Sequence, residues 1–361
     1  MILSSVSSGV DTLCYDYPLT SEQKKAMVAY LRTRKGFIRG KRDYFAETKL
    51  YHSDAFWEWG IKIYIRKFAA GPWHLNLIVH PVMVLGDPDR TMLWEPSKSE
   101  YSKICSIISK ILNKSGLTVN ADQLSLTRVD LTTNLGFPEQ DLVDTYLRIL
   151  KKGMLLPHYR LERFSEKEHK AKNCKVANAH SYKQSCKSAA FFAYDKVSQL
   201  EMLDDCSTAL ANRHILRLEV QLNSKGMQKW LDEADKSDTW KTICSLSAQH
   251  YKILAWYLSR ILPAADDHIR YSEAAEIIER LRKSKTRERL QYFLRKQSDC
   301  KDLQTALEKT AEKFKLNKSK PRKLLEKCRR MGLNPITLKN DDKHERLPSL
   351  VTILKRLKRF S

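Results

Sequence analysis

The sequence has no run of about 18 consecutive apolar residues, the length that a membrane-spanning helix needs. Its first residues, MILSSVSSGVDTL, lack the basic start of a secretory signal. We therefore expect a cytoplasmic protein without a membrane span. Low-complexity tracts, long linkers rich in proline or glycine, and internal repeats are also lacking. A chain of 361 residues, 42% of them hydrophobic, is long enough for about two packed domains, which excludes global disorder.

Paired cysteines are lacking too. None of the eight cysteines belongs to a CxxC motif, and they are spread from Cys14 to Cys328. Free thiols in a reducing compartment fit this distribution better than a disulfide framework does.

Acidic residues are too few to balance the basic ones. The chain holds 65 Lys and Arg against 42 Asp and Glu, which gives a formal net charge of +23. A surplus of this size favours a polyanionic partner, and nucleic acid is the first candidate. The surplus is concentrated at one end, because residues 281–361 hold 25 Lys and Arg against 9 Asp and Glu.

Strand and helix patterns alternate along the first two thirds of the chain, whereas the residues after about 237 are typical of almost continuous helix. We predict an α+β fold with a mostly antiparallel sheet, helices on one of its faces, and a C-terminal all-helical domain. The boundary between residues 1–233 and 234–361 falls at LDEADKSDTW, where Ser237 or Asp238 can cap the next helix. The strands expected in residues 1–233 lie at 9–17, 44–51, 56–68, 74–85, 124–133, 189–194 and 214–222. The helices expected in the same residues begin at residue 20 or 21, at residue 100 and at residue 140.

Alternation of apolar and polar residues gives the expected strands two different faces. In HILRLEVQL (214–222), Arg217, Glu219 and Gln221 fall on one side, and leucine and valine on the other. If the apolar sides pack on the helices, the open face of the sheet collects Asp130, Glu219, His80, Asn76, Arg128 and Arg217. Two carboxylates with imidazole or amide ligands suit Mg²⁺ or Mn²⁺, and the nearby arginines suit a phosphate.

A nucleophile for phosphate chemistry is offered by Tyr194 in FFAYDKVSQLE, where a predicted strand ends and a helix begins. A tyrosine hydroxyl is a weak nucleophile at its usual pKa near 10, so a neighbouring cation or a metal-polarised phosphate has to help it. Lys196 is the obvious cation. The structural alternative for Tyr194 is a packed aromatic side chain, and Tyr182 or Tyr159 is then the candidate nucleophile.

The segments GVDTL, HPVMVLG, TRVDLTTN, AFFAYDK and ILRLEVQL occur in this order over about residues 9–230. Together they resemble the rolling-circle replication initiators of filamentous phages, the gene II type that includes the cholera-toxin phage initiators. More distantly they are similar to plasmid rolling-circle initiators, which share the Tyr-Asp-Lys segment. The resemblance implies a metal-dependent tyrosine nuclease and strand transferase with a rolling-circle nuclease-like sheet.

The resemblance also implies how the reaction proceeds. Tyr194 matches the nucleophile that attacks one phosphodiester at the phage origin, becomes linked to the 5′ phosphate and frees a 3′-OH primer, before the displaced strand is rejoined. Lys196 matches the lysine that stabilises the phosphate. The implied partners are single- and double-stranded origin DNA and a helicase and DNA polymerase of the bacterial host; a homo-oligomer is compatible with the resemblance. Because GxxxxGK[ST] is missing from the chain, unwinding falls to that helicase.

The same resemblance assigns metal ligands. Asp130 and Glu219 match the acidic residues of two strands in the family. Where gene II relatives carry a third acidic residue, this sequence has Asn76, and His80 stands just before the proline. The third ligand is therefore open between His80, Asn76 and His74.

Structural roles compete with these metal assignments. Asp130 and Glu219 can pair with Arg128 and Arg217 as cross-strand ion pairs without any metal. Asp11, on the first expected strand, is either a further ligand or a residue of a turn or sheet edge. Surface histidines with satisfied hydrogen bonds are the alternative for the imidazole ligands.

A basic segment, KEHKAKNCKVANAHSYKQSCK (167–187), interleaves six lysines with two histidines and two cysteines. Its spacings fit no compact ligand pair, so zinc is disfavoured. We expect a loop whose lysines, Lys183 and Lys187 among them, contact phosphates and guide single-stranded DNA toward Tyr194. The alternative is a solvated basic loop.

The C-terminal region predicts two helices within residues 303–334, the second ended by Gly332. Basic residues surround the second helix, a distribution consistent with helix-turn-helix docking on duplex DNA. We expect DNA contacts from Lys320, Arg322, Lys323 and Arg329. The tail LVTILKRLKRF has an apolar stripe that we expect to dock on the domain or on DNA. A non-catalytic DNA-binding regulator of replication or transcription explains the charge and the helix pattern equally well and is the competing function.

Overall fold

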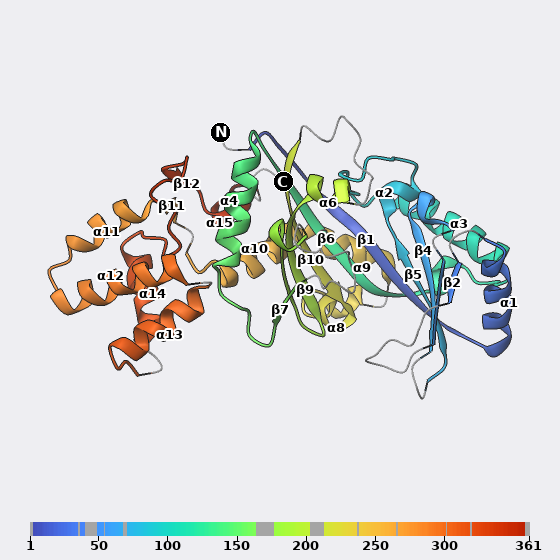
Figure 1. Cartoon of the computed structure of the whole chain (residues 1–361). Helices are drawn as coiled ribbons and strands as arrows, with labels where there is room; N and C mark the ends of the chain where they lie inside the picture. Colours follow the sequence, from blue (N-terminus) through green and yellow to red (C-terminus); the bar gives the residue numbers. More distant parts are fainter. Residues whose placement is uncertain are drawn as a thin grey trace.

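The computed structural model describes residues 3–34, 37–39, 49–53, 55–67, 71–163, 177–202, 213–236, 238–264, 266–300, 302–317 and 320–357 (Figure 1). These residues form an α+β structure built on one ten-stranded sheet, in which the neighbouring strands are antiparallel. The predicted fold class and the antiparallel sheet are confirmed. Within the described residues, no helix combines the length and the apolar character that crossing a bilayer requires.

The strand order of the sheet is β2-β3-β4-β5-β1-β6-β10-β9-β8-β7. In chain order the strands are β1 (Ser5–Leu19), β2 (Phe37–Arg39), β3 (Lys49–Ser53), β4 (Ile61–Lys67), β5 (Trp73–Val79), β6 (Ser125–Phe137), β7 (Arg160–Glu162), β8 (Ser181–Ser185), β9 (Ala189–Asp195) and β10 (His214–Asn223). The two longest strands, β1 and β6, pair with each other at the centre of the sheet.

The two halves of the sheet repeat one arrangement. Each half starts with a central strand, which a 12-residue helix follows, α1 (Ser21–Arg32) in the first half and α4 (Gln140–Lys151) in the second. Four more strands then fill the half from its outer edge inward, so that β5 lies beside β1 and β10 beside β6. A four-residue helix follows each of these, α2 (Pro81–Val84) and α8 (Ser224–Met227). The expectation of no internal repeat is wrong for the topology, which is duplicated about an approximate two-fold axis between β1 and β6.

The main hydrophobic core lies between one face of the sheet and a layer of helices. Besides α1 and α4, this layer contains α3 (Lys98–Lys114), α9 (Thr239–Ala248), α10 (His250–Ile261) and α15 (Leu350–Leu357). The apolar stripe of the tail docks here as expected, since Leu350, Ile353 and Leu354 are buried in the core. The predicted boundary at residue 233 does not separate the hydrophobic clusters, because α9 and α10 complete the core of the sheet.

A second, smaller hydrophobic cluster joins four helices at one end of the molecule (Figure 1). They are α11 (Tyr271–Glu279), α12 (Ser284–Asp299), α13 (Leu303–Lys313) and α14 (Lys320–Arg330). The two predicted helices of residues 303–334 correspond to α13 and α14, and Gly332 follows the second with a φ of +64°, as a helix-ending glycine should. The unit contacts the rest of the protein where the Leu303 amide donates to the Lys152 carbonyl at 2.9 Å.

Some predicted element ends differ from the structure. The strand predicted at 74–85 stops at Val79, because Pro81 starts α2 and has no amide hydrogen for the ladder. The strand predicted at 56–68 starts only at Ile61, because the 3₁₀ turn η1 (Trp57–Trp59) precedes it and ends at Gly60. Residues 44–48 of the strand predicted at 44–51 lie outside the described residues, and the rest belongs to β3. Of the two proposed caps, Asp238 caps α9 and residue 237 lies outside the described residues.

The buried side chain of His268 makes the stability of the protein depend on pH. It is fully buried in β11 (His268–Ile269), which pairs with β12 (Arg346–Leu347), and its Nδ1 donates to the Ile336 carbonyl at 2.7 Å. Nε2 is buried without a partner, so protonation would place an unpaired charge in the interior. Burial accordingly lowers the pKa of His268 to about 4.

We predict that this histidine destabilises the protein in acid. Its pKa in the unfolded chain is about 6.5, so the unfolded state binds the proton first as the pH falls, and stability is lost between about pH 6.5 and 4. The loss attributable to His268 is about 3 kcal/mol. Urea unfolding of the wild type and of His268→Gln at pH 7 and pH 4.5 measures it. The variant should lose less stability on acidification, and equal losses would contradict the assignment.

Candidate active site

The open face of the sheet carries the candidate site at its centre. Asp130 lies on β6, Glu219 on the neighbouring β10 and Tyr194 on β9, the next strand. All three line one cavity of about 320 Å³. The alternation of the sequence therefore predicts the correct face for Asp130 and Glu219, and the structure places Tyr194 on that face as well.

A chain of hydrogen bonds joins the predicted residues. The Tyr194 hydroxyl donates to Glu219 Oε2 at 3.2 Å. Gln221 Nε2 lies between the two carboxylates, donating to Glu219 Oε1 at 2.9 Å and to Asp130 Oδ2 at 3.3 Å. Arg128 Nη2 completes the chain with a 2.8 Å bond to Asp130 Oδ2. The phenol and the two carboxylates are thus part of one network, and the Arg128 pairing expected for a structural role is present as well.

Asp130 and Glu219 are two buried carboxylates with too little positive charge around them. Asp130 is 1% exposed, and its Oδ1 is buried without a hydrogen-bond partner. Burial raises the pKa of Asp130 well above its usual value, and the charge of Glu219 adds to this although Arg128 opposes it. Burial and the charge of Asp11 raise the pKa of Glu219. A proton or a cation at the unsatisfied oxygen would relieve this repulsion, so the pair fits a divalent metal ion.

Asp11, which the sequence leaves open, belongs to the site. A β-bulge between Val10 and Thr12 leaves Asp11 without a residue opposite it in β6, and the side chains of Asp11 and Thr12 then bond to each other at 3.0 Å. Both line the cavity of Tyr194. Asp11 precedes α1 by ten residues, as Asp130 precedes α4, and a valine comes before each of them. This repeated Val-Asp spacing is the sequence signal that could have placed Asp11 in the site.

Arg217 does not face solvent, which contradicts the expected direct DNA contact. It is fully buried, and Nη1 pairs with Asp11 Oδ1 at 2.7 Å. Nε donates to Asn134 Oδ1 at 2.7 Å, and Nη2 donates to the carbonyls of Arg90 and Thr91 at 3.2 and 3.1 Å. Burial would raise the pKa of Asp11, but the Arg217 cation holds it at about 2. Arg217 is therefore a positioning residue that keeps Asp11 charged and fixed.

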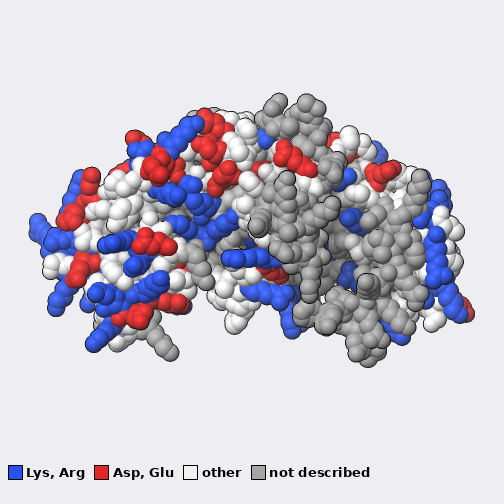
Figure 2. All heavy atoms as spheres, viewed as in Figure 1, with Lys and Arg blue, Asp and Glu red and all other residues white. Residues whose placement is uncertain are grey.

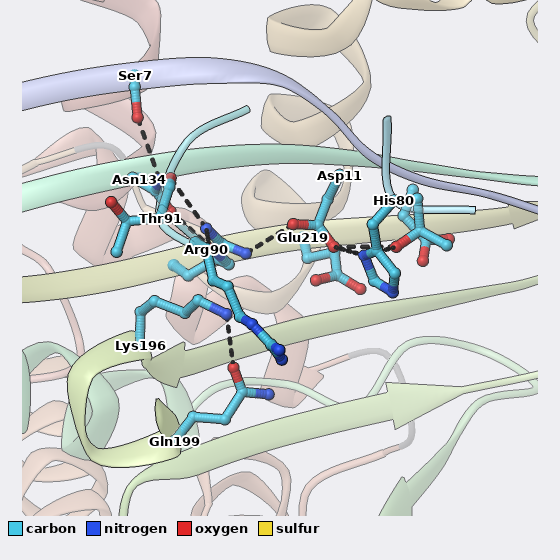
Figure 3. A network of polar contacts seen from close by, with 12 residues as sticks. Ser7, Asp11, His80, Arg90, Thr91, Asn134, Lys196, Gln199 and Glu219 are labelled. Carbon is cyan, nitrogen blue, oxygen red and sulfur yellow. Dashed lines mark hydrogen bonds and ion pairs between the residues drawn. The ribbon is translucent and has the colours of Figure 1, made fainter. Parts of the chain in front are cut away.

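Two further predicted residues, Lys196 and His80, stand beside the same network (Figure 3). Lys196 begins α6 (Lys196–Met202), is 7% exposed and donates to Gln199 Oε1 at 2.9 Å. Burial, with the nearby Arg217 cation, lowers the pKa of Lys196 to about 7. His80 Nδ1 lies 3.3 Å from the Thr12 hydroxyl, and burial lowers the pKa of His80 to about 4. The imidazole is thus neutral at pH 7, the form that can bind a metal.

Asn76 and His74 lie elsewhere on the open face. Asn76 donates to Asp16 Oδ1, and His74 Nδ1 lies 2.8 Å from Asp16 Oδ2. Neither lines the cavity that holds Tyr194. Asn76 precedes α2 by five residues, as Glu219 precedes α8, so it occupies the equivalent place in the other half of the sheet. Of the three alternatives for a third ligand, only His80 lies at the cavity.

A second group of possible metal ligands consists of Asp144, His180 and Asp195, whose ligand atoms lie within 4.8 Å of one another. Among the described residues no other three His, Cys, Asp or Glu side chains meet that distance. Asp195 already accepts bonds from the backbone amides of Val197 and Ser198, so it caps α6. Sequence reasoning missed this group, because His180 lies in the basic segment whose spacings disfavoured zinc.

The alternative nucleophiles lie outside the cavity. Tyr182 is 5% exposed, belongs to the main core and bonds to Gln184. The Tyr159 hydroxyl donates to that of Tyr257 at 3.2 Å. Neither residue lines the cavity of Asp130 and Glu219, which leaves Tyr194 as the tyrosine at the carboxylates.

The expected DNA-binding lysines and arginines are spread over distant places. Lys183 lies at the cavity, where it pairs with Glu162, and Lys187 is exposed between β8 and β9. Residues 167–176 of the basic segment lie outside the described residues, as does the side chain of Lys320. Exposed cations of α14 are Arg322, Lys323 and Arg329. Figure 2 shows Lys and Arg mixed with Asp and Glu over the end of the molecule that the four helices form.

Comparison with known proteins assigns no family. No protein-family model matches the chain, and no curated protein matches it. The resemblance to phage initiators therefore depends on the sequence motifs alone.

The two possible metal groups can be told apart by thermal unfolding. We predict that Mn²⁺ at about 100 times its dissociation constant raises the melting temperature of the wild type by roughly 3–8 °C. Asp130→Asn should abolish this shift, because it removes the negative charge that would bind the ion, whereas the matched variant Asp144→Asn should keep it. Loss of the shift in Asp144→Asn alone would place the ion at the second group.

Proposed function

We propose that the protein is a metal-dependent DNA nuclease and strand transferase that cuts one strand through Tyr194 and later rejoins it. The observation that carries this proposal is the 3.2 Å hydrogen bond from the Tyr194 hydroxyl to Glu219, in a cavity shared with Asp130. A phenol beside two buried carboxylates on an open sheet face is suited to transesterification at a phosphate. In line with the motif resemblance, we propose a rolling-circle nuclease-like fold and phage origin DNA as the substrate.

The residues present fit a Mg²⁺ or Mn²⁺ ion. Asp130, through its unsatisfied Oδ1, and Glu219 would hold it, with the neutral His80 imidazole close by. Such an ion supplies Lewis-acid polarisation of a phosphoryl oxygen. The chain itself supplies the nucleophile, its proton acceptor and a cation.

Two side chains accept and donate the protons that move in the proposed cleavage step. The Tyr194 oxygen attacks phosphorus and gives its proton to Glu219, to which it is already hydrogen-bonded. The bond from phosphorus to the 3′ oxygen breaks, and this oxygen takes a proton from the Lys196 ammonium, which yields a free 3′-OH and a 5′-phosphotyrosine. A lysine with a pKa of about 7 and a carboxylate with a raised pKa suit these transfers. Rejoining runs the same transfers in reverse and restores both groups.

Duplex DNA is the proposed ligand of the helical unit. Arg322, Lys323 and Arg329 are exposed on α14, where they can contact backbone phosphates. The same exposed cations favour the competing function, a non-catalytic DNA-binding regulator. A host helicase and polymerase, acting at the freed 3′ end in the cytoplasm of a bacterial cell, belong to the proposal that the motifs suggest.

Replacing the nucleophile separates catalysis from binding. We predict that Tyr194→Phe lowers nicking of supercoiled origin DNA at least about 1000-fold and abolishes covalent attachment, because Tyr194 carries the hydroxyl that is hydrogen-bonded to Glu219 among the described residues. Duplex binding should stay within about twofold of the wild type. Nicking is read on agarose gels, and attachment is read as a DNA-linked peptide by mass spectrometry.

Tyr182→Phe is the matched control, since it removes a buried hydroxyl from the opposite face and should keep nicking activity. Nicking by Tyr194→Phe at the wild-type rate would exclude the proposed nucleophile. Wild-type protein that binds but never cuts, with Mg²⁺ or Mn²⁺ present, would favour the regulator.

A further inference from the structure

A cavity near the candidate site has a volume of about 710 Å³ and lies where α1, η1, α2 and α3 meet. We name it the Trp59 groove. Its lining includes the aromatic and basic side chains of Tyr30, Arg34, Trp59, Arg90, Lys110 and Lys114. Met83 and Arg90 also line the small cavity that contains Tyr194 and Lys196. The groove therefore adjoins the candidate site, on the side of the sheet's first half.

Cations and aromatic rings line the groove together. Four basic side chains face two carboxylates. Trp59 is 55% exposed, while Phe56, whose ring centre lies 5.9 Å away, is buried beneath it. The Arg34 guanidinium lies 4.7 Å over the Tyr30 ring. Figure 2 shows Lys and Arg along the edge of the molecule where Figure 1 draws α1 and α3.

This combination selects for one kind of ligand. Exposed indole and phenol faces are platforms for nucleobases, and a cationic border attracts a phosphate backbone. A purely apolar ligand would not need the four cations. A DNA duplex keeps its bases stacked inside, so it could not offer them to Trp59, and a cavity of about 710 Å³ is in the size range of small-ligand pockets. Unpaired nucleotides satisfy both the rings and the charges.

We propose that the Trp59 groove binds unpaired bases of the DNA strand whose neighbouring phosphate lies at Tyr194. A base stacks on Trp59, and Arg34, Lys110 and Lys114 contact the phosphates. This inference rests on the proposed nuclease function, which it deepens by making locally single-stranded DNA the substrate form.

Binding of a short fluorescent oligo(dT) to the full chain tests the proposal. The chain carries Tyr194→Phe, so that no strand is cut during the measurement. Trp59→Ala should weaken binding about 5- to 150-fold, the usual effect of losing one base stack, whereas Trp59→Phe should keep most of the affinity. Trp256→Ala is the matched control: Trp256 is 38% exposed, lies outside the groove and stacks with Arg260, so its loss should leave binding unchanged.

Two results would overturn the proposal. One is equal binding of oligo(dT) by the Trp59→Ala variant and its parent. The other is competition by thymidine monophosphate at the same nucleotide concentration, with equal strength and the same Trp59 dependence, which would make the groove a free-nucleotide pocket. Nicking is measured separately, with protein that retains Tyr194. Trp59-dependent binding without nicking would overturn the proposed function alone, and nicking with Trp59-independent binding would overturn this inference alone.

Discussion

The fully buried guanidinium of Arg217 connects three neighbouring strands at the centre of the sheet. Arg217 on β10 pairs with Asp11 on β1 and bonds to Asn134 on β6 and to the carbonyls of Arg90 and Thr91. Burying such a charge is costly, and removing one partner of a buried pair costs about 3–5 kcal/mol, so these contacts depend on one another. The pair fixes the bulge at Asp11, and through it the position of one carboxylate in the site.

The duplicated sheet explains why the chemistry lies where it does. Central strands from both halves each contribute an aspartate, so the site forms close to the axis between β1 and β6. Farther from this axis, the two halves of the sheet carry different residues at equivalent positions. Counted back from the short helix that follows each strand, Asn76 takes the place of Glu219, and the pairing with the next strand then puts Arg66 in the place of Tyr194. One half therefore carries the phenol and its carboxylate, while the other half carries the Trp59 groove.

Part of the site could be predicted because strand periodicity is local. Alternation in two short segments is enough to place Asp130 and Glu219 on one face, and strand pairing then brings Tyr194 of β9 to the same face. The burial of Arg217 could not be predicted in this way. It depends on Asn134 and on the loop at residues 90–91, which approach it only in the folded chain.

The same distinction applies to the fold. The amphipathic stripe of residues 350–357 predicts a docking helix, but its place in the core of the sheet depends on contacts with α10, which no local pattern encodes. The bulge at Asp11 is likewise a property of two paired strands, not of one segment. The duplicated topology has no counterpart in residue identities beyond the Val-Asp spacing, because strands need only apolar alternation to occupy equivalent positions.

The DNA contacts that we propose lie on different parts of the molecule. The helical unit lies at one end of the molecule, and α1 and α3, which line the Trp59 groove, lie at the other, with β1 of Asp11 and β10 of Glu219 between them (Figure 1). A duplex held by α14 and an unpaired strand held at Trp59 would have to meet at the open face. On the proposed function, the strand has to be unpaired when it reaches the Trp59 groove, because a duplex does not offer its bases to an indole. In this proposal the half-buried Tyr194 phenol acts on the phosphate next to the bases that the groove holds.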